Sequence, residues 1–293
     1  MDNRIRQKFT AAILEEVLAR IDIEQQKLNL LDGFESFVYE FSREERDYIL
    51  KISHSSRRTA DMIHGEIDWL QYLAAFDVPV AKPALSARGN YIEIIGDNTE
   101  YFTAISFEKV PGTFVSQEQW TPALFLKMGQ IMGRMHHLTK SYKPARSNYK
   151  RPEWYEETAG FAEKYLPESE NLVKEKYADL CTFLMSLPKD KDSYGLIYYD
   201  FHSGNFYVDQ DRIFLFDFDD CQYSWFADDI AIALFYAVPH HCDTPQALNR
   251  AREFYDQFMA GYARENTIDP AWLSRIPHFL KLREIDLYIC IHR

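Results

Sequence analysis

Short apolar runs alternate with acidic or amide side chains over residues 195–217, and this pattern restricts the possible folds more than any other part of the chain. Apolar runs of this length, bounded by polar turn residues, are typical of β-strands. Because each polar residue adjoins the end of a run, we expect the polar side chains to lie on neighbouring loops. The runs are residues 195–199, 206–208 and 213–216, and the polar residues beside them are Asp200, Asn205 and Asp217.

These three polar side chains suit phosphoryl transfer. The carboxylate of Asp200 can accept the proton of a substrate hydroxyl, while Asn205 and Asp217 can hold magnesium on the phosphates of a nucleotide. A β-meander with ordinary polar turn residues would look similar, and the spacing between Asp200 and Asn205 has little specificity by itself. The ordered set of three favours the functional interpretation.

Length and charge exclude several classes of protein. The chain has 293 residues, 46% of them hydrophobic, which is enough for one large domain or two lobes with cores of their own. Asp and Glu total 45 against 33 Lys and Arg, and a net charge of -12 disfavours nucleic acid or an anionic membrane as a partner. We expect neither a signal peptide nor a membrane span in residues 1–21, because their apolar runs are too short. The scattered cysteines predict free thiols in a cytoplasmic protein, without a zinc site; they are Cys181, Cys221, Cys242 and Cys290.

The order of predicted elements changes near Pro111 and Gly112, a pair that ends the strand pattern before it. The earlier part predicts two helices and four strands, and the later part is mostly helical around the strand-rich centre. The earlier elements are helices 9–21 and 57–76, with strands 37–41, 47–53, 91–95 and 101–110. The later helices are 123–138, 153–165, 171–187, 228–238, 245–262 and 270–292.

Lys51 and Glu66 form a candidate ion pair in the earlier part. Ile49 and Lys51 share one face of a strand because side chains alternate along it. Glu66 lies on the apolar face of the following helix, where a carboxylate is costly unless a cation pairs with it. We expect Lys51 to be that cation; the alternative is that Glu66 reaches water at the edge of the apolar face.

On these residues the chain resembles the aminoglycoside phosphotransferase and choline kinase-like family. The resemblance implies an α+β, bilobal protein-kinase-like fold: a small N-terminal lobe with an antiparallel sheet and one main helix, and a larger, mostly helical C-terminal lobe. It implies a nucleotide-binding lobe at residues 1–107, a catalytic and substrate lobe at residues 108–293, and a hinge at about residues 107–112.

The resemblance also implies roles for individual residues. Lys51 would hold the α- and β-phosphates with Glu66 as its partner. Asp200 would be the catalytic base, and Asp229 would brace the catalytic loop. The implied magnesium ligands are Asn205 and Asp217. The implied nucleotide contacts are Gly33, Ser36 and Val38 in a phosphate-covering loop, Ile49 and Val38 on the adenine ring, and Phe107, Glu108 and Val110 in the hinge.

The implied activity is that of a kinase, a phosphotransferase that uses ATP and Mg²⁺ and has an alcohol group as acceptor. The small-molecule acceptor stays open between an amino alcohol, an aminoglycoside, homoserine and a sugar, and a protein serine or threonine is the alternative. Acids and aromatic residues near the metal aspartate suit a cationic amine, although they equally suit a core and turn residues. They are Asp219, Asp220, Tyr223, Trp225, Tyr236 and His240. A monomer and a homodimer are both open.

One departure from the family pattern concerns the residues before the predicted base. The family has His-Gly there, whereas this chain has Tyr198 and Tyr199. We expect altered packing of the catalytic loop with the chemistry retained. The competing interpretation is a degenerate kinase that binds nucleotide without catalysis, and a structural protein on the same fold would need no intact acids.

Overall fold

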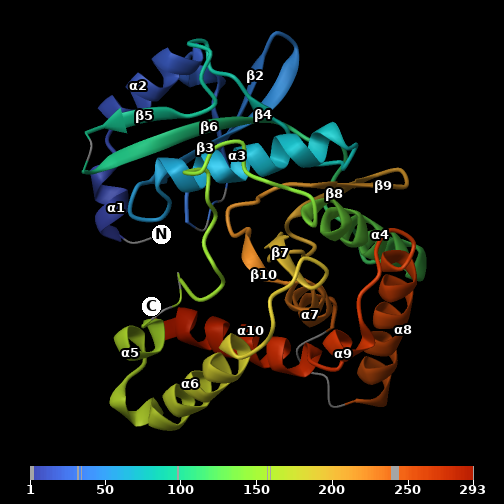
Figure 1. The fold of residues 1–293 in the computed structure, drawn as a ribbon. Helices are drawn as coiled ribbons and strands as arrows, with labels where there is room; N and C mark the ends of the chain where they lie inside the picture. The colour runs from blue at the N-terminus through green and yellow to red at the C-terminus, as the bar shows by residue number, and fades with distance from the viewer. Residues whose placement is uncertain are drawn as a thin grey trace. The chain divides into compact units, whose positions relative to one another are not determined.

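The computed structural model describes residues 3–31, 33, 35–97, 99–156, 158, 160–238 and 244–292, and Figure 1 shows how its helices and strands follow one another. The chain divides into two compact units. Unit 1 comprises Met1–Pro111, Lys143–Lys150 and Phe214–Asp219, and unit 2 comprises Gly112–Tyr142, Arg151–Ile213 and Asp220–Arg293. The hinge role assigned to residues 107–112 stays a prediction.

Unit 1 is built on an antiparallel sheet of six strands. The order is β1 (Asn29–Leu31), β2 (Phe37–Arg43), β3 (Arg46–His54), β6 (Tyr101–Glu108) and β4 (Pro83–Ala84), and β5 (Glu93–Gly96) also pairs with β6. The four longer strands were predicted from the sequence. β1 and β4 were not, because runs of two or three residues are too short for alternation to be recognised.

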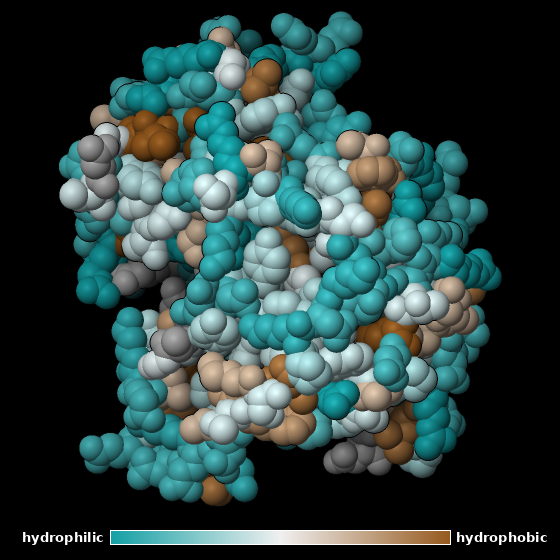
Figure 2. Space-filling model, viewed as in Figure 1, coloured by the Kyte–Doolittle hydropathy of each residue, from teal (hydrophilic) through white to brown (hydrophobic). Residues whose placement is uncertain are grey.

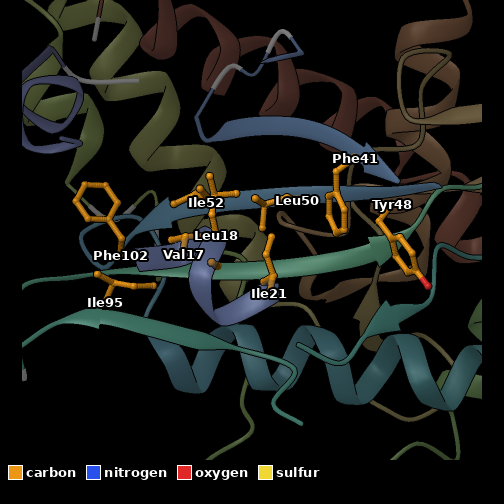
Figure 3. Close-up of a cluster of buried hydrophobic side chains, with 10 residues drawn as sticks. Val17, Leu18, Ile21, Phe41, Tyr48, Leu50, Ile52, Ile95 and Phe102 are labelled. Carbon is orange, nitrogen blue, oxygen red and sulfur yellow. The ribbon is translucent and has the colours of Figure 1, made fainter. Parts of the chain in front are cut away.

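Helix α2 (Ala11–Ile21) covers one face of this sheet. Thr10 begins the helix by accepting a hydrogen bond from the Ile13 backbone. Val17 and Leu18 of the helix then pack with Leu50 from the central strand in one buried cluster, drawn in Figure 3. Burial of these side chains fixes the central strand β3 in the unit. The short helices α1 (Asn3–Lys8) and η1 (Gln25–Lys27) flank α2 in the chain.

Helix α3 (Ala60–Ala75) also belongs to unit 1. Thr59 caps its first turn by accepting from the Met62 backbone. Segment Lys143–Lys150 lies against this helix, because the Ala145 backbone donates to Asp68 at 3.1 Å and the Asn148 amide donates to Asp61 at 2.7 Å. These contacts hold the helix that carries Glu66.

The later part of the chain forms two two-stranded sheets, and helix α7 (Phe226–Ala237) contacts the strands of one of them. β7 (Tyr194–Ile197) pairs antiparallel with β10 (Gln222–Trp225), and β8 (Phe206–Asp209) pairs with β9 (Arg212–Leu215). The three strands predicted in this stretch are present, and β10 is an additional strand. The remaining helices are α4 (Pro122–Thr139), α5 (Phe161–Tyr165), η2 (Glu168–Glu170), α6 (Asn171–Met185), α8 (Pro245–Tyr262), α9 (Pro270–Leu273) and α10 (Ile276–His292).

Two helix predictions were wrong. Only the last part of the helix predicted over residues 153–165 forms, because the Trp154 backbone donates to the Tyr223 carbonyl at 2.9 Å and so joins the edge of a strand. The helix predicted over residues 270–292 ends at Leu273 and begins again at Ile276, since the Arg275 backbone bonds back to the Trp272 carbonyl in a tight turn.

Glycines bring α4 and α8 close together in unit 2. A Cβ atom at Gly129 would lie 1.8 Å from the Phe258 carbonyl oxygen, and one at Gly261 would lie 1.8 Å from the Leu126 carbonyl oxygen. Neither backbone oxygen can move without shifting its helix, so only glycine fits at these crossings.

Gly129→Ala is therefore expected to lower the free energy of unfolding by about 3 kcal/mol, because the added methyl forces two packed helices apart. Urea unfolding followed by circular dichroism measures the loss. Gly89→Ala is the control: Gly89 has φ 80 with no atom within 4 Å of an added Cβ, so only backbone strain of about 1 kcal/mol is expected. Equal losses in the two variants would show that the packing of α4 against α8 tolerates a Cβ at position 129.

The visible face of the molecule is mostly hydrophilic, with apolar side chains in small separate patches (Figure 2). Within the described part of the chain, every helix is too short or too polar to serve as a membrane span.

Candidate active site

Lys51 is the centre of a charged cluster in unit 1. Its Nζ lies 2.8 Å from Asp217 Oδ1 and 3.3 Å from Asp219 Oδ1. Burial alone would lower the pKa of Lys51, but the carboxylates of Asp217, Asp219 and Glu66 outweigh burial and hold that pKa above its usual value. Lys51 is therefore a fixed positive charge.

Glu66 is buried, with 3% of its surface exposed, on the face of α3 that the sequence predicted. Its negative charge raises the pKa of Lys51 together with the two aspartates. The structure thus adds Asp217 and Asp219 as direct contacts of the lysine, with Glu66 acting on it electrostatically.

Asp217 and Asp219 differ in their surroundings. Asp219 is held by Arg57 Nη2 at 3.2 Å and Arg58 Nη2 at 3.6 Å in addition to Lys51. Asp217 instead has a side chain that is 49% exposed, on a backbone in the left-handed region with φ 56. Asp217 can therefore offer a carboxylate oxygen to a metal ion, whereas the charge of Asp219 is matched inside the protein.

The sheet face opposite α2 carries several of the nucleotide contacts that the sequence predicts. Ile49 and Lys51 point away from the face of Leu50 because side chains alternate along β3. Directly paired residues share a face; Val38 pairs with Lys51, and Phe107 pairs with Ile49. The register therefore places four of the predicted residues on one surface.

The other predicted nucleotide contacts are Gly33, Ser36, Glu108 and Val110. Contacts within the protein constrain the first three of them. A Cβ at Gly33 would lie 2.3 Å from the Ser36 carbonyl oxygen, so the loop itself requires this glycine. The Ser36 hydroxyl shares a 2.8 Å hydrogen bond with Ser53. The Glu108 backbone donates to the Lys82 carbonyl at 2.8 Å. Val110 follows β6 and is partly buried.

Asp200 is the centre of a second cluster, in unit 2. Its Oδ2 accepts from Asn205 Nδ2 at 2.7 Å and from His202 Nε2 at 3.2 Å, and its Oδ1 accepts from Arg283 Nη2 at 2.8 Å. The Gly204 backbone donates to His202 Nδ1, which places the ring proton on Nε2. Burial raises the pKa of Asp200, but these three donors more than offset burial and hold that pKa below its ordinary value. Asp200 is therefore an ionised carboxylate, as a proton acceptor must be.

Asn205 fits a role as a metal ligand. Its Nδ2 donates to the carboxylate and to the backbone carbonyl of Asp200, and neither bond uses the amide oxygen. No group of three or more His, Cys, Asp or Glu side chains suited to a metal occurs in the described ranges. Mg²⁺ does not need such a group, because it is commonly held by one or two side chains together with substrate phosphates. Asn205 in unit 2 and Asp217 in unit 1 each carry an oxygen of the kind that binds Mg²⁺.

Asp229, to which the resemblance assigns a bracing role, binds the backbone just before Asp200. It is fully buried, and its carboxylate accepts from the Tyr198 backbone at 3.1 Å, the Tyr199 backbone at 2.8 Å and His136 Nε2 at 3.0 Å. The two backbone donors directly precede Asp200, so Asp229 fixes the backbone that leads into Asp200.

Asp229→Ala is expected to lower the free energy of unfolding by about 3 kcal/mol or more, because two buried backbone N–H groups lose their acceptor. Thermal unfolding measures this loss. Asp192→Ala removes an exposed carboxylate paired with Lys140 and is expected to cost less than about 0.5 kcal/mol. A melting temperature for Asp229→Ala equal to that of the control would show that the brace is dispensable.

Tyr198 and Tyr199 replace the His-Gly of the family pattern by making bonds of their own. The Tyr198 ring is fully buried, and its hydroxyl donates to the Asn205 carbonyl at 3.1 Å. Tyr199 adopts φ 69, a left-handed conformation that glycine adopts more readily than other residues. The tyrosine thus keeps the backbone conformation that a glycine would favour at this position.

The candidate acceptor contacts fall in different surroundings. Trp225 is fully buried, its Nε1 donates to the Pro188 carbonyl at 3.0 Å, and its ring packs against Trp154, which favours the core interpretation. Tyr223 lies in β10 and its carbonyl accepts from the Tyr194 hydroxyl at 3.0 Å. The charge of Asp220 acts on Tyr236, whose hydroxyl accepts from Arg283. His240 lies outside the described residues.

Arg283 was missed by the sequence analysis. It lies on α10 and contacts Asp200 from 83 positions away in the chain. A single arginine in a helix carries no sequence signal that it is buried against a carboxylate, because neither its spacing nor its neighbours mark it.

Comparisons with known proteins identify the family of this chain. Residues 28–273 match the model of the group described as the phosphotransferase enzyme family. An amicoumacin kinase from Bacillus subtilis (strain 168) is 40% identical over 286 residues, which covers 96% of this chain and 84% of that protein.

Solved structures show the same fold. An amicoumacin kinase in complex with AMP-PNP, Ca²⁺ and Ami has a TM-score of 0.93 and 37% identity, and the match covers 100% of this chain and 89% of the other. The choline kinase of Streptococcus pneumoniae, at 16% identity, has a TM-score of 0.62 over 98% of this chain and 90% of its own. The predicted α+β, protein-kinase-like fold is confirmed.

Proposed function

This chain belongs to the phosphotransferase enzyme family, and on that premise we propose that it is an ATP-dependent kinase that transfers the γ-phosphate to a hydroxyl of amicoumacin or a close structural relative of it. The observation that supports the acceptor is the 40% identity to an amicoumacin kinase across 96% of this chain. The aminopropanol kinase among the similar structures is only 23% identical and informs the fold alone.

Asp200 is the proposed base. Its carboxylate is ionised, it is held by donors on both oxygens, and 18% of its side chain stays exposed. It would orient the acceptor hydroxyl and accept its proton as the bond to the γ-phosphorus forms and the bond to the ADP oxygen breaks. Since phosphoryl transfer has a loose transition state, positioning and charge matter more here than the strength of the base.

Lys51 is proposed to bind the phosphates, and Asn205 and Asp217 to hold Mg²⁺. Magnesium, when bound, would neutralise charge on the β- and γ-phosphates. The carboxylates of Asp217 and Asp219 keep Lys51 protonated, so it can offer a positive charge to phosphate oxygens. Val38, Ile49 and Phe107 share a surface that could receive the adenine ring.

Incubation with γ-labelled ATP, Mg²⁺ and amicoumacin tests the proposal, with mass spectrometry to locate the added phosphate. We expect one phosphate on one hydroxyl, and no product when EDTA replaces Mg²⁺. Parallel reactions with choline, homoserine, kanamycin and casein test the other acceptor classes. Binding of ATP without transfer to any acceptor would instead identify a nucleotide-binding module.

A further inference from the structure

Helix α10 contacts the proposed base, Asp200, through Arg283. Its Nη2 donates both to Asp200 Oδ1 at 2.8 Å and to the Tyr236 hydroxyl at 2.6 Å. Its side chain is 13% exposed. Burial of a guanidinium is costly unless its charge is matched. Here Nη2 has two acceptors, whereas the buried Nε has no hydrogen-bond partner among the described residues.

Two tyrosine rings hold this guanidinium in place, and an acid binds the hydroxyl of one of them. Its central carbon lies 5.3 Å from the centre of the Tyr199 ring and 5.2 Å from the centre of the Tyr236 ring, within the range of cation–π attraction. The Tyr199 hydroxyl donates to Asp286 Oδ2 at 3.4 Å, and Asp286 lies one helical turn beyond Arg283 on α10. Tyr199 is thereby fixed at its backbone by Asp229 and at its hydroxyl by Asp286.

The bonds to Asp200 divide between its two oxygens. Asn205 and His202 both bind Oδ2, whereas Arg283 binds Oδ1. With Oδ2 alone bound, the carboxylate could still swing about its side-chain torsions, and a displacement of about 1 Å in a reacting group can cost roughly 100-fold in rate. A second anchor on Oδ1 removes that freedom.

We propose that Arg283, held by Tyr199 and Tyr236, is a positioning residue for phosphate transfer: it fixes the Asp200 carboxylate in the orientation in which it receives the acceptor hydroxyl. This inference rests on the proposed function, because it takes Asp200 as the base. It also assigns a role to Tyr199, because the ring of this residue forms one wall of the site that holds the guanidinium.

Arg283→Met and Arg283→Lys test the proposal with ATP, Mg²⁺ and amicoumacin. For Arg283→Met we expect kcat to fall about 100-fold while KM for ATP and for amicoumacin each change less than about threefold, because the lost contact acts on the base. Arg283→Lys, which can still donate to Oδ1, is expected to recover about tenfold of the loss, and added ethylguanidinium is expected to raise the rate of Arg283→Met but not of wild type.

Arg275→Met is the matched control, because Arg275 also lies over an aromatic ring, at 4.6 Å from the centre of Trp272, and carries the same charge. It is expected to keep wild-type kcat. A kcat of Arg283→Met within threefold of an active wild type would overturn the positioning role and leave the proposed function standing. A loss in Arg283→Met that neither lysine nor ethylguanidinium relieves, accompanied by a lower melting temperature, would show a structural role only. A wild type that transfers phosphate to no acceptor would overturn both proposals.

Discussion

Asp200→Asn is expected to lower kcat for phosphate transfer by about 10³-fold while ATP affinity stays within about threefold of wild type. The amide has the size of the carboxylate and its one oxygen can still accept from Arg283, but it cannot take a proton. Because these interactions hold the pKa of Asp200 below its ordinary value, the wild-type base is fully ionised at neutral pH, so the substitution removes a group that is active in every molecule.

Single-turnover transfer from labelled ATP measures the chemical step directly, and calorimetry measures nucleotide affinity. Asp211→Asn is the matched control in unit 2: its side chain is 95% exposed and pairs only with Lys127 among the described residues, so we expect wild-type rates. A single-turnover rate for Asp200→Asn that equals this control would remove Asp200 as the base and with it the proposed mechanism.

The strand ends beside Asp200, Asn205 and Asp217 could be predicted because short apolar runs bounded by polar residues have a strong local signal. The same holds for Lys51 on its strand, where alternation fixes the face, and for Glu66, whose burial followed from helical spacing. In each case, the information lies within about ten neighbouring residues.

Features that depend on distant parts of the chain could not be predicted in this way. Arg283 meets Asp200 only because α10 packs against α7. Asp219 looked like a turn residue or an acceptor contact, yet Arg57 and Arg58 from another part of unit 1 bind it. Residues 153–165 were expected to form one helix because their composition suits a helix, but the Trp154 backbone donates to the Tyr223 carbonyl at a strand edge instead. In all three cases, hydrogen bonds or ion pairs between residues far apart in the sequence determine the structure.

Asp217→Asn is expected to weaken Mg²⁺-dependent nucleotide binding by about 100-fold, because a charged oxygen ligand contributes far more to holding Mg²⁺ than an amide does. Asp217 is also the more exposed of the two aspartates that contact Lys51. The loss should appear only when the metal is present: in EDTA, the nucleotide affinity of the variant should match that of wild type or exceed it, since Lys51 then has one carboxylate fewer as a competitor.

Titration of ATP by calorimetry, with Mg²⁺ and with EDTA, separates these outcomes. Asp47→Asn is the control, an exposed carboxylate of unit 1 that accepts from the Ser42 hydroxyl at 2.6 Å, and it should leave both affinities unchanged. Asp219→Asn makes an informative contrast: because Asp219 binds Arg57, Arg58 and Lys51, its replacement should reduce the melting temperature more than Asp217→Asn does. If the ATP affinity of Asp217→Asn differed between Mg²⁺ and EDTA as much as that of wild type does, the metal would have to be held without this carboxylate. The assignment of Asp217 as a metal ligand would then be wrong.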